Sequence, residues 1–279
     1  MTKWFHPGQF FLVITVIGTI FLSPVRAANL DRLEAFLEVT GFDVALESIR
    51  LSAENAPNMI GLEAEDFGSE WTRLVEDVFD TEQMHAMALD ILSQTLEDDL
   101  LTHAVDFYAS DLGRRLVAAE NTSHMEEDEA LRTESGEAIV AGLVQIGSPR
   151  LEELKRLNKA VGSEDASVRA IQEVQVRFLM AAASAGVIEL RMEEADLRES
   201  LKSQEGELRR SMQLAGLTGS AYTYQAFSDD DITAYADALE HPKMQQVYEL
   251  MNAVQFEIMA NRYEAVAARL QKLQPSQDL

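Results

Sequence analysis

The chain of 279 residues contains no cysteine, and this absence excludes several kinds of chemistry. Without a thiol it can form no disulfide, carry no lipid on a cysteine and use no cysteine nucleophile. The sequence also lacks a G-x-S-x-G turn, a glycine-rich phosphate loop and an H-E-x-x-H zinc motif. We therefore expect a non-catalytic protein without a cofactor, whose stability comes from its core.

Positive charge is scarce as well. The chain has 23 Lys and Arg against 48 Asp and Glu, which gives a formal net charge of −25. Such a surface repels phosphate backbones and anionic lipids, which argues against binding to nucleic acid or to a membrane surface. It favours solubility, divalent cations and basic partners, and the simplest interpretation is that the acids solvate the outer faces of helices.

Long hydrophobic runs are missing except at the amino terminus. Residues 10–22 form an apolar run that follows Lys3, and Val25 and Ala27 occupy the small-residue positions of a cleavage site. The run spans about 20 Å, less than the roughly 30 Å of a bilayer core, and the later candidate at 178–190 is flanked by charges. We predict a signal peptide over residues 1–27, cleavage near Ala27, a periplasmic location and no stable membrane insertion afterwards.

Most of the remaining chain has the apolar spacing of helices. Asp80 followed by Gln83 predicts a capped helix start, and Ser148 followed by Pro149 predicts another, with Pro149 as the first helical residue. Residues 164–213 contain no proline and predict two long helices with a hinge near 184–186. No stretch alternates in the period-two pattern of strands, so we predict an all-α, multi-helix bundle.

Two stretches are rich in Gly, Pro, Asn, Ser and Thr and predict ordered loops, residues 55–69 and 214–228. Each of these stretches precedes helices that lead into a corner. The two corner sequences, "VDFYASDLGRRL" (105–116) and "ADALEHPKMQQV" (236–247), have a similar outline of apolar and polar residues and are separated by 131 residues. We interpret this outline as an internal repeat, with repeat one at 28–148 and repeat two at 149–279.

The repeated outline has the residues of a tight corner between two helices. In the first copy Ser110 is a suitable cap, Asp111 suits the positive end of a helix dipole, and Gly113 permits a close approach. In the second copy His241 precedes Pro242, which favours the end of one helix and the first turn of the next.

The first corner carries a resemblance to a known family. Phe107, Tyr108, Ser110 and Gly113 resemble the Phe-Tyr, Ser-Pro, Gly corner of bacterial exported helical proteins grouped as domain-of-unknown-function family twenty fifty-nine. Asp111 departs from that pattern, and in the second copy only Pro242 is retained. The resemblance is clearest over residues 96–116, is weaker over 227–247, and implies a helical protein of the cell envelope without an assigned catalytic residue.

Three residues leave a second interpretation open. Asp99, His103 and Asp106 fall on one helical face and are suitable ligands for a divalent metal, which would fit a cation-binding protein or a metal-dependent hydrolase. The other interpretation is a solvated face. Methionines such as Met244 and Met251 could line a groove for a protein partner, or simply fill the core. We expect an interaction or scaffold protein of the envelope, with its oligomeric state left open.

Overall fold

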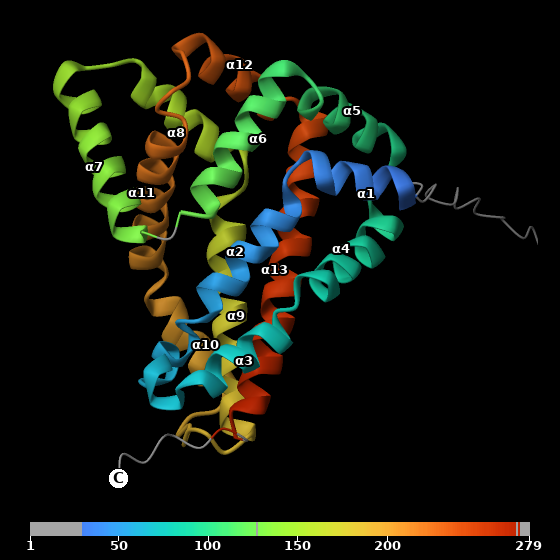
Figure 1. Cartoon of the computed structure of the whole chain (residues 1–279). Coiled ribbons are helices and arrows are strands. Elements are labelled where there is room, and N and C mark those ends of the chain that lie inside the picture. The colour runs from blue at the N-terminus through green and yellow to red at the C-terminus, as the bar shows by residue number, and fades with distance from the viewer. Residues whose placement is uncertain (1–29, 127, 272, 274–279) are drawn as a thin grey trace, which may run out of the picture.

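The structure is a computed structural model that describes residues 30–126, 128–271 and 273. The predicted signal peptide lies outside these ranges. Within them the chain consists of helices joined by short connections and has no β-strand, which confirms the all-α prediction (Figure 1). In the same ranges, none of the helices combines the length and the apolar character that a membrane crossing requires.

The described ranges contain thirteen α-helices and two short 3-10 helices. Up to residue 146 these are α1 (Leu30–Val39), α2 (Phe42–Ala53), η1 (Ala56–Ile60), η2 (Ala64–Phe67), α3 (Ser69–Val78), α4 (Thr81–Thr95), α5 (Asp98–Tyr108), α6 (Asp111–His124) and α7 (Glu129–Ile146). They are followed by α8 (Arg150–Ala160), α9 (Glu164–Ser184), α10 (Glu194–Ser203), α11 (Glu205–Thr223), α12 (Asp229–Leu239) and α13 (Pro242–Leu270).

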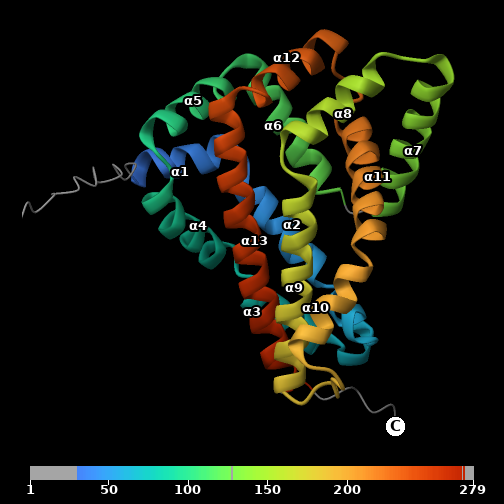
Figure 2. The same cartoon turned by 180° about the vertical axis from the view of Figure 1, so that it is seen from behind.

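The long helix α13 runs through the middle of the molecule (Figures 1 and 2). It packs along α9 and also contacts α2, α3, α4 and α5 from the amino-terminal part of the chain. On the side opposite to α1 and α4, α7 lies at the outer edge and packs against α11 and α8. The last helix of the chain therefore joins the first helices into one body.

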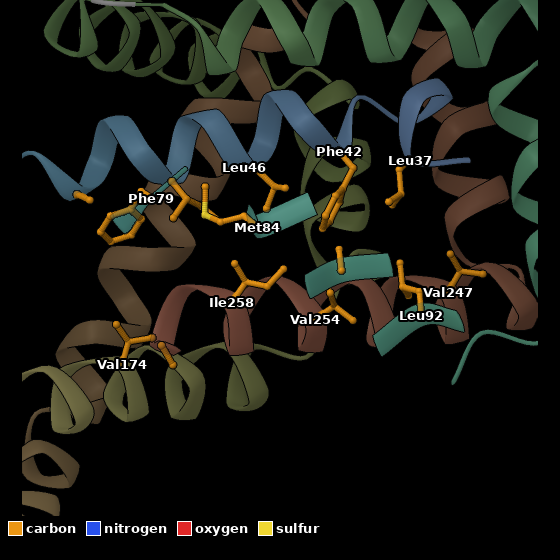
Figure 3. Close-up of a cluster of buried hydrophobic side chains, with 14 of the residues drawn as sticks. Leu37, Phe42, Leu46, Phe79, Met84, Leu92, Val174, Val247, Val254 and Ile258 are labelled. Atoms are coloured by element: carbon orange, nitrogen blue, oxygen red, sulfur yellow. The ribbon is translucent and has the colours of Figure 1, made fainter. Parts of the chain in front are cut away.

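Most of the buried apolar side chains form one cluster that draws on both halves of the chain. Figure 3 shows its centre, where Leu46 on α2 and Met84 on α4 point toward Val254 and Ile258 on α13. All four side chains are essentially inaccessible to solvent. Burying an aliphatic side chain of this size contributes roughly 1.5–3 kcal/mol, so the layer between α2 and α13 is a main source of stability.

Several predicted helix ends are confirmed. Asp80 caps α4, where its Oδ1 accepts a hydrogen bond of 2.8 Å from the backbone nitrogen of Gln83. The predicted hinge coincides with the end of α9 at Ser184, and α13 begins at Pro242. These ends depend on local capping chemistry, which short sequence patterns describe well.

The prediction of a loop at 214–228 is wrong over most of its length, because α11 continues through Thr223. Packing against α7, α8 and α9 outweighs the weak helix preference of its Gly, Ser and Thr residues. The second predicted long helix is also two helices, α10 and α11, which meet at Gln204. Pro149 is the cap of α8 instead of its first residue.

The helix positions support the proposal of an internal repeat. Helix α5 begins at Asp98 and α12 at Asp229, while α6 begins at Asp111 and α13 at Pro242; each pair is separated by 131 residues. The contacts also correspond, because α1 packs on α4 and α5 as α8 packs on α11 and α12. The division at residue 148 stays a prediction, and the two parts share the core cluster described above.

Candidate functional site

The first corner joins α5 to α6 within two residues. The hydroxyl of Ser110 accepts a hydrogen bond of 3.0 Å from the backbone nitrogen of Gly113 and so caps α6. A Cβ atom at Gly113 would lie 2.3 Å from the carbonyl oxygen of Phe107 and 2.7 Å from the Cα of Tyr108. Only a glycine fits this corner without movement of the backbone.

The second corner joins α12 to α13 and uses different residues. His241 caps α13, with its Nδ1 3.3 Å from the backbone nitrogen of Lys243, and Pro242 is the first residue of the helix. Met244, at the place that corresponds to Gly113, is fully buried. The two corners therefore reach similar turns through different local contacts.

The helices that flank the two corners contact each other in the fold. The imidazole rings of His103 on α5 and His241 stack with a centroid distance of 4.2 Å. Lys243 Nζ lies 3.2 Å from Asp99 Oδ2, and Arg115 Nη2 donates to Asp231 Oδ1 over 2.9 Å. These contacts are exposed and contribute little stability individually, but they show that α5 and α6 contact α12 and the start of α13.

Two of the three proposed metal ligands, Asp99 and His103, lie at this contact. Asp99 faces the ammonium group of Lys243, and His103 faces His241. Burial, with His241 and Lys243 nearby, lowers the pKa of His103, and Asp106 opposes this change. In the described part of the chain, no group of three or more His, Cys, Asp or Glu residues is placed to hold a metal ion. Metal binding by Asp99, His103 and Asp106 stays a prediction.

A buried network of tyrosines and one carboxyl group lies behind the corners. Glu120 on α6 accepts hydrogen bonds at Oε1 from Tyr224 and Tyr235, at 2.8 and 2.9 Å. The hydroxyl oxygens of Tyr235 and Tyr248 are 3.2 Å apart, and those of Tyr248 and Tyr108 are 2.5 Å apart. The network connects α5 and α6 to the end of α11, α12 and α13.

The direction of these hydrogen bonds follows from the number of protons that the tyrosine hydroxyl groups can donate. Each phenol has a single proton, and Tyr235 donates its proton to Glu120. Tyr248 must therefore donate to Tyr235, and Tyr108 must donate to Tyr248. All four hydroxyl groups are thus oriented toward Glu120, directly or through a neighbour.

Burial sets the ionisation of the network. It raises the pKa of Glu120, although the hydrogen bonds from Tyr224 and Tyr235 oppose this effect. Burial also raises the pKa of Tyr248 to about 12 and raises the pKa values of the other three tyrosines well above their ordinary value. The tyrosines therefore stay protonated at neutral pH and act as hydrogen-bond donors.

Helix α7 presents a different kind of surface. Gly136 is its buried residue, and a Cβ atom there would lie 2.4 Å from the carbonyl oxygen of Thr218 on α11. Around this contact the helix is open to solvent, and the side chains of Val144 and Ile146 are 61% and 76% exposed. We refer to the exposed Leu131, Val144 and Ile146 of α7 and Leu214 of α11 as the α7 surface.

The predicted methionine groove is not found as an open surface. Met84 and Met244 are fully buried, and Met251 and Met259 are partly buried against the same cluster. These side chains therefore belong to the core, which is the other interpretation of their helical spacing. Four of the exposed large apolar side chains of the described residues lie on α7 and α11 instead.

Comparisons with known proteins give one match. No curated protein and no solved structure matches the chain. A family model does match a segment that extends from α4 into α7 and includes the first corner. This confirms the resemblance stated above: residues 82–141 match the bacterial family described as "Uncharacterized protein conserved in bacteria (DUF2059)".

Proposed function

We propose that this is a non-catalytic, exported protein of the cell envelope that binds a protein partner through the α7 surface. The observation that carries this proposal is the uncharged second half of α7, in which Val144 and Ile146 are exposed. Residues 138–147 contain no charged side chain in a protein whose formal net charge is −25. Apolar residues that gather on an exposed element are typical of interaction sites.

The position of α7 supports this interpretation. The helix packs against α11 and α8 on one side, while Val144 and Ile146 on its other faces extend into solvent. Of the large apolar side chains exposed in the described residues, five lie on α7, beside it or on α11: Met125, Leu131, Val144, Ile146 and Leu214. A partner that contacts the exposed part of α7 would bury apolar area without unfolding any part of the core.

The charge of the chain favours a protein as the partner. A strongly acidic protein is repelled by anionic lipid headgroups and by nucleic acid, so an apolar surface on it is poorly suited to either. A helix of another envelope protein with a matching apolar face fits the geometry of α7. The envelope location rests on the predicted signal peptide and on the family resemblance.

Site-specific photo-crosslinking tests the proposal. A photoreactive amino acid at Val144 should give an adduct with another protein in intact cells, whereas the same residue at Met192 should not. Met192 is the matched control because it is also a large apolar side chain, 43% exposed, but lies between α9 and α10. Equal labelling at both positions, or none at Val144, would contradict the assignment.

A binding experiment with the purified partner identified in this way gives the second test. Ile146→Glu places a charge in the contact and should weaken binding by about tenfold or more. Met192→Glu should leave the affinity unchanged. Both side chains are exposed, so neither variant should change the free energy of unfolding by more than about 0.5 kcal/mol. Loss of binding in both variants would show that the effect is not specific to α7.

A further inference from the structure

A cavity of 480 Å³ opens beside the tyrosine network. Its walls come from α6, α7, α8, α11, α12 and α13, and Glu120, Tyr224, Tyr235 and Tyr248 form part of its lining. Glu120 uses Oε1 for both tyrosine hydrogen bonds, and its Oε2 makes no hydrogen bond to any described residue. The volume is in the range of small-molecule sites, and the lining combines aromatic rings with a few polar groups.

The charge of this cavity is not balanced. Arg132 at its wall is paired with Glu129, with 3.8 Å between Nη2 and Oε1, and donates to the backbone carbonyl of Ser123. Burial and the nearby Arg132 lower the pKa of His124, so this imidazole is neutral at neutral pH. Glu120 makes no ion pair within the described part of the chain, which leaves its carboxyl group without a counter-charge. A ligand with a positive charge would supply one.

A second polar group in the same lining lacks a partner. The Oδ1 of Asn158 on α8 accepts a hydrogen bond of 2.8 Å from Ser220, but its buried Nδ2 has no acceptor in the described part of the chain. A buried donor without an acceptor costs stability unless a bound molecule provides one. A ligand with an acceptor oxygen in addition to its charge would satisfy this donor if the Asn158 side chain turned toward the cavity.

A glycine keeps this cavity open. Gly219 lies in the interior of α11, where glycine weakens a helix, and it lines the same space. A Cβ atom at Gly219 would have no atom within 4 Å, so close packing does not require a glycine there. A side chain at this position would instead occupy the cavity. We therefore attribute the glycine at position 219 to the need to keep the cavity open.

We propose that the cavity between α6 and α11 binds a small organic ammonium compound that also carries an acceptor oxygen, such as an amino alcohol or a free amino acid. Glu120 holds the ammonium group, with the faces of Tyr224 and Tyr235 beside it, and Asn158 donates to the oxygen. Aromatic rings around a carboxylate are well suited to an organic cation. This proposal is independent of the α7 surface.

Calorimetry and thermal unfolding of the mature protein test the assignment. The probes are ethanolamine, choline and the free amino acids, each compared with an uncharged alcohol or amide of similar size. We expect at least one ammonium compound to bind and to raise the midpoint of thermal unfolding, and its uncharged counterpart to do neither. Binding of no ammonium compound, or equal binding of charged and uncharged probes, would overturn the proposal.

Two variants locate the site. Glu120→Gln should weaken binding by about tenfold or more, because it removes the charge that faces the ammonium group. Gly219→Leu should abolish binding by filling the cavity, whereas Gly142→Leu should bind normally. Gly142 is the matched control, since it is also a helical glycine with nothing near its Cβ position but lies on α7 away from the cavity. Circular dichroism checks that each variant is folded, and unchanged binding in Gly219→Leu would refute the location even if Glu120→Gln failed to fold.

Discussion

Replacing Gly113 by alanine tests whether the first corner depends on a close contact between α5 and α6. The added methyl group would lie 2.3 Å from the carbonyl oxygen of Phe107, whereas ordinary contacts begin at 3.4 Å. The neighbouring atoms are backbone atoms of Phe107 and Tyr108 and cannot turn away as a flexible side chain could. The helices must therefore separate by roughly 1 Å, which also disturbs the cap between Ser110 and Gly113.

The expected loss of stability follows from two opposing effects. Overpacking of this kind costs about 1–3 kcal/mol, while alanine stabilises a helix by about 0.5–1 kcal/mol relative to glycine. The methyl group would meet backbone atoms in a closely packed corner, so we expect a cost near the upper end of this range and a net loss of about 2 kcal/mol. Gly142→Ala, at an open helical position, should instead gain about 0.5–1 kcal/mol.

Urea denaturation followed by circular dichroism measures both changes. The dependence of the unfolding free energy on urea should keep the same slope in all three proteins, which would show that the denatured state is unchanged. The two variants should differ by about 2–3 kcal/mol. If Gly113→Ala is as stable as the unmodified protein, the corner does not need its glycine for packing and the reasoning fails.

Three further predictions concern other parts of the chain. Burial raises the pKa of Glu120 above its ordinary value of 4.5. Below that pH the carboxyl is protonated in both the folded and the unfolded protein, so it does not affect the free energy of unfolding. As the pH rises above 4.5, the carboxyl ionises more readily in the unfolded protein, and the folded protein loses stability. Glu120→Gln should therefore gain stability relative to the unmodified protein as the pH rises above about 4.5 in denaturation experiments, and a difference independent of pH would contradict this. Gly136→Ala brings a methyl group within 2.4 Å of the Thr218 carbonyl and should lower the unfolding free energy by about 1–3 kcal/mol; no loss in chemical denaturation would mean that α7 is not held closely on α11. Mass spectrometry of the mature protein should find an amino terminus at or near Ala28, and an intact Met1 in the membrane fraction would overturn the export prediction.

The sequence patterns that gave correct predictions are local ones. Asp80 with Gln83, and the start of a helix at Pro242, depend on residues within one turn of each other. The loop predicted at 214–228 failed because the glycines of α11 were taken as breaks, while the helix is held by α7, α8 and α9. Tertiary contacts of this kind have no local signal.

The residues of the buried network illustrate the same limit. Glu120 is one of 48 acidic residues, and nothing around it in the sequence distinguishes it from a solvated glutamate. Its partners Tyr224 and Tyr235 lie more than 100 positions away. The α7 surface is different, because the uncharged run at 138–147 is visible in the sequence and could have indicated an exposed apolar helix.

The place of α13 in the fold has a consequence for the order of synthesis and folding. Helices α2 to α5 pack on α13, which begins at Pro242, so the core around Leu46 and Met84 lacks one of its walls until nearly the whole chain has been made. Contacts between such distant segments form late and slowly compared with local ones. A growing chain therefore cannot complete this core before α13 has been made. On the proposed export, this arrangement would keep residues 30–241 from closing their core before α13 has crossed the membrane.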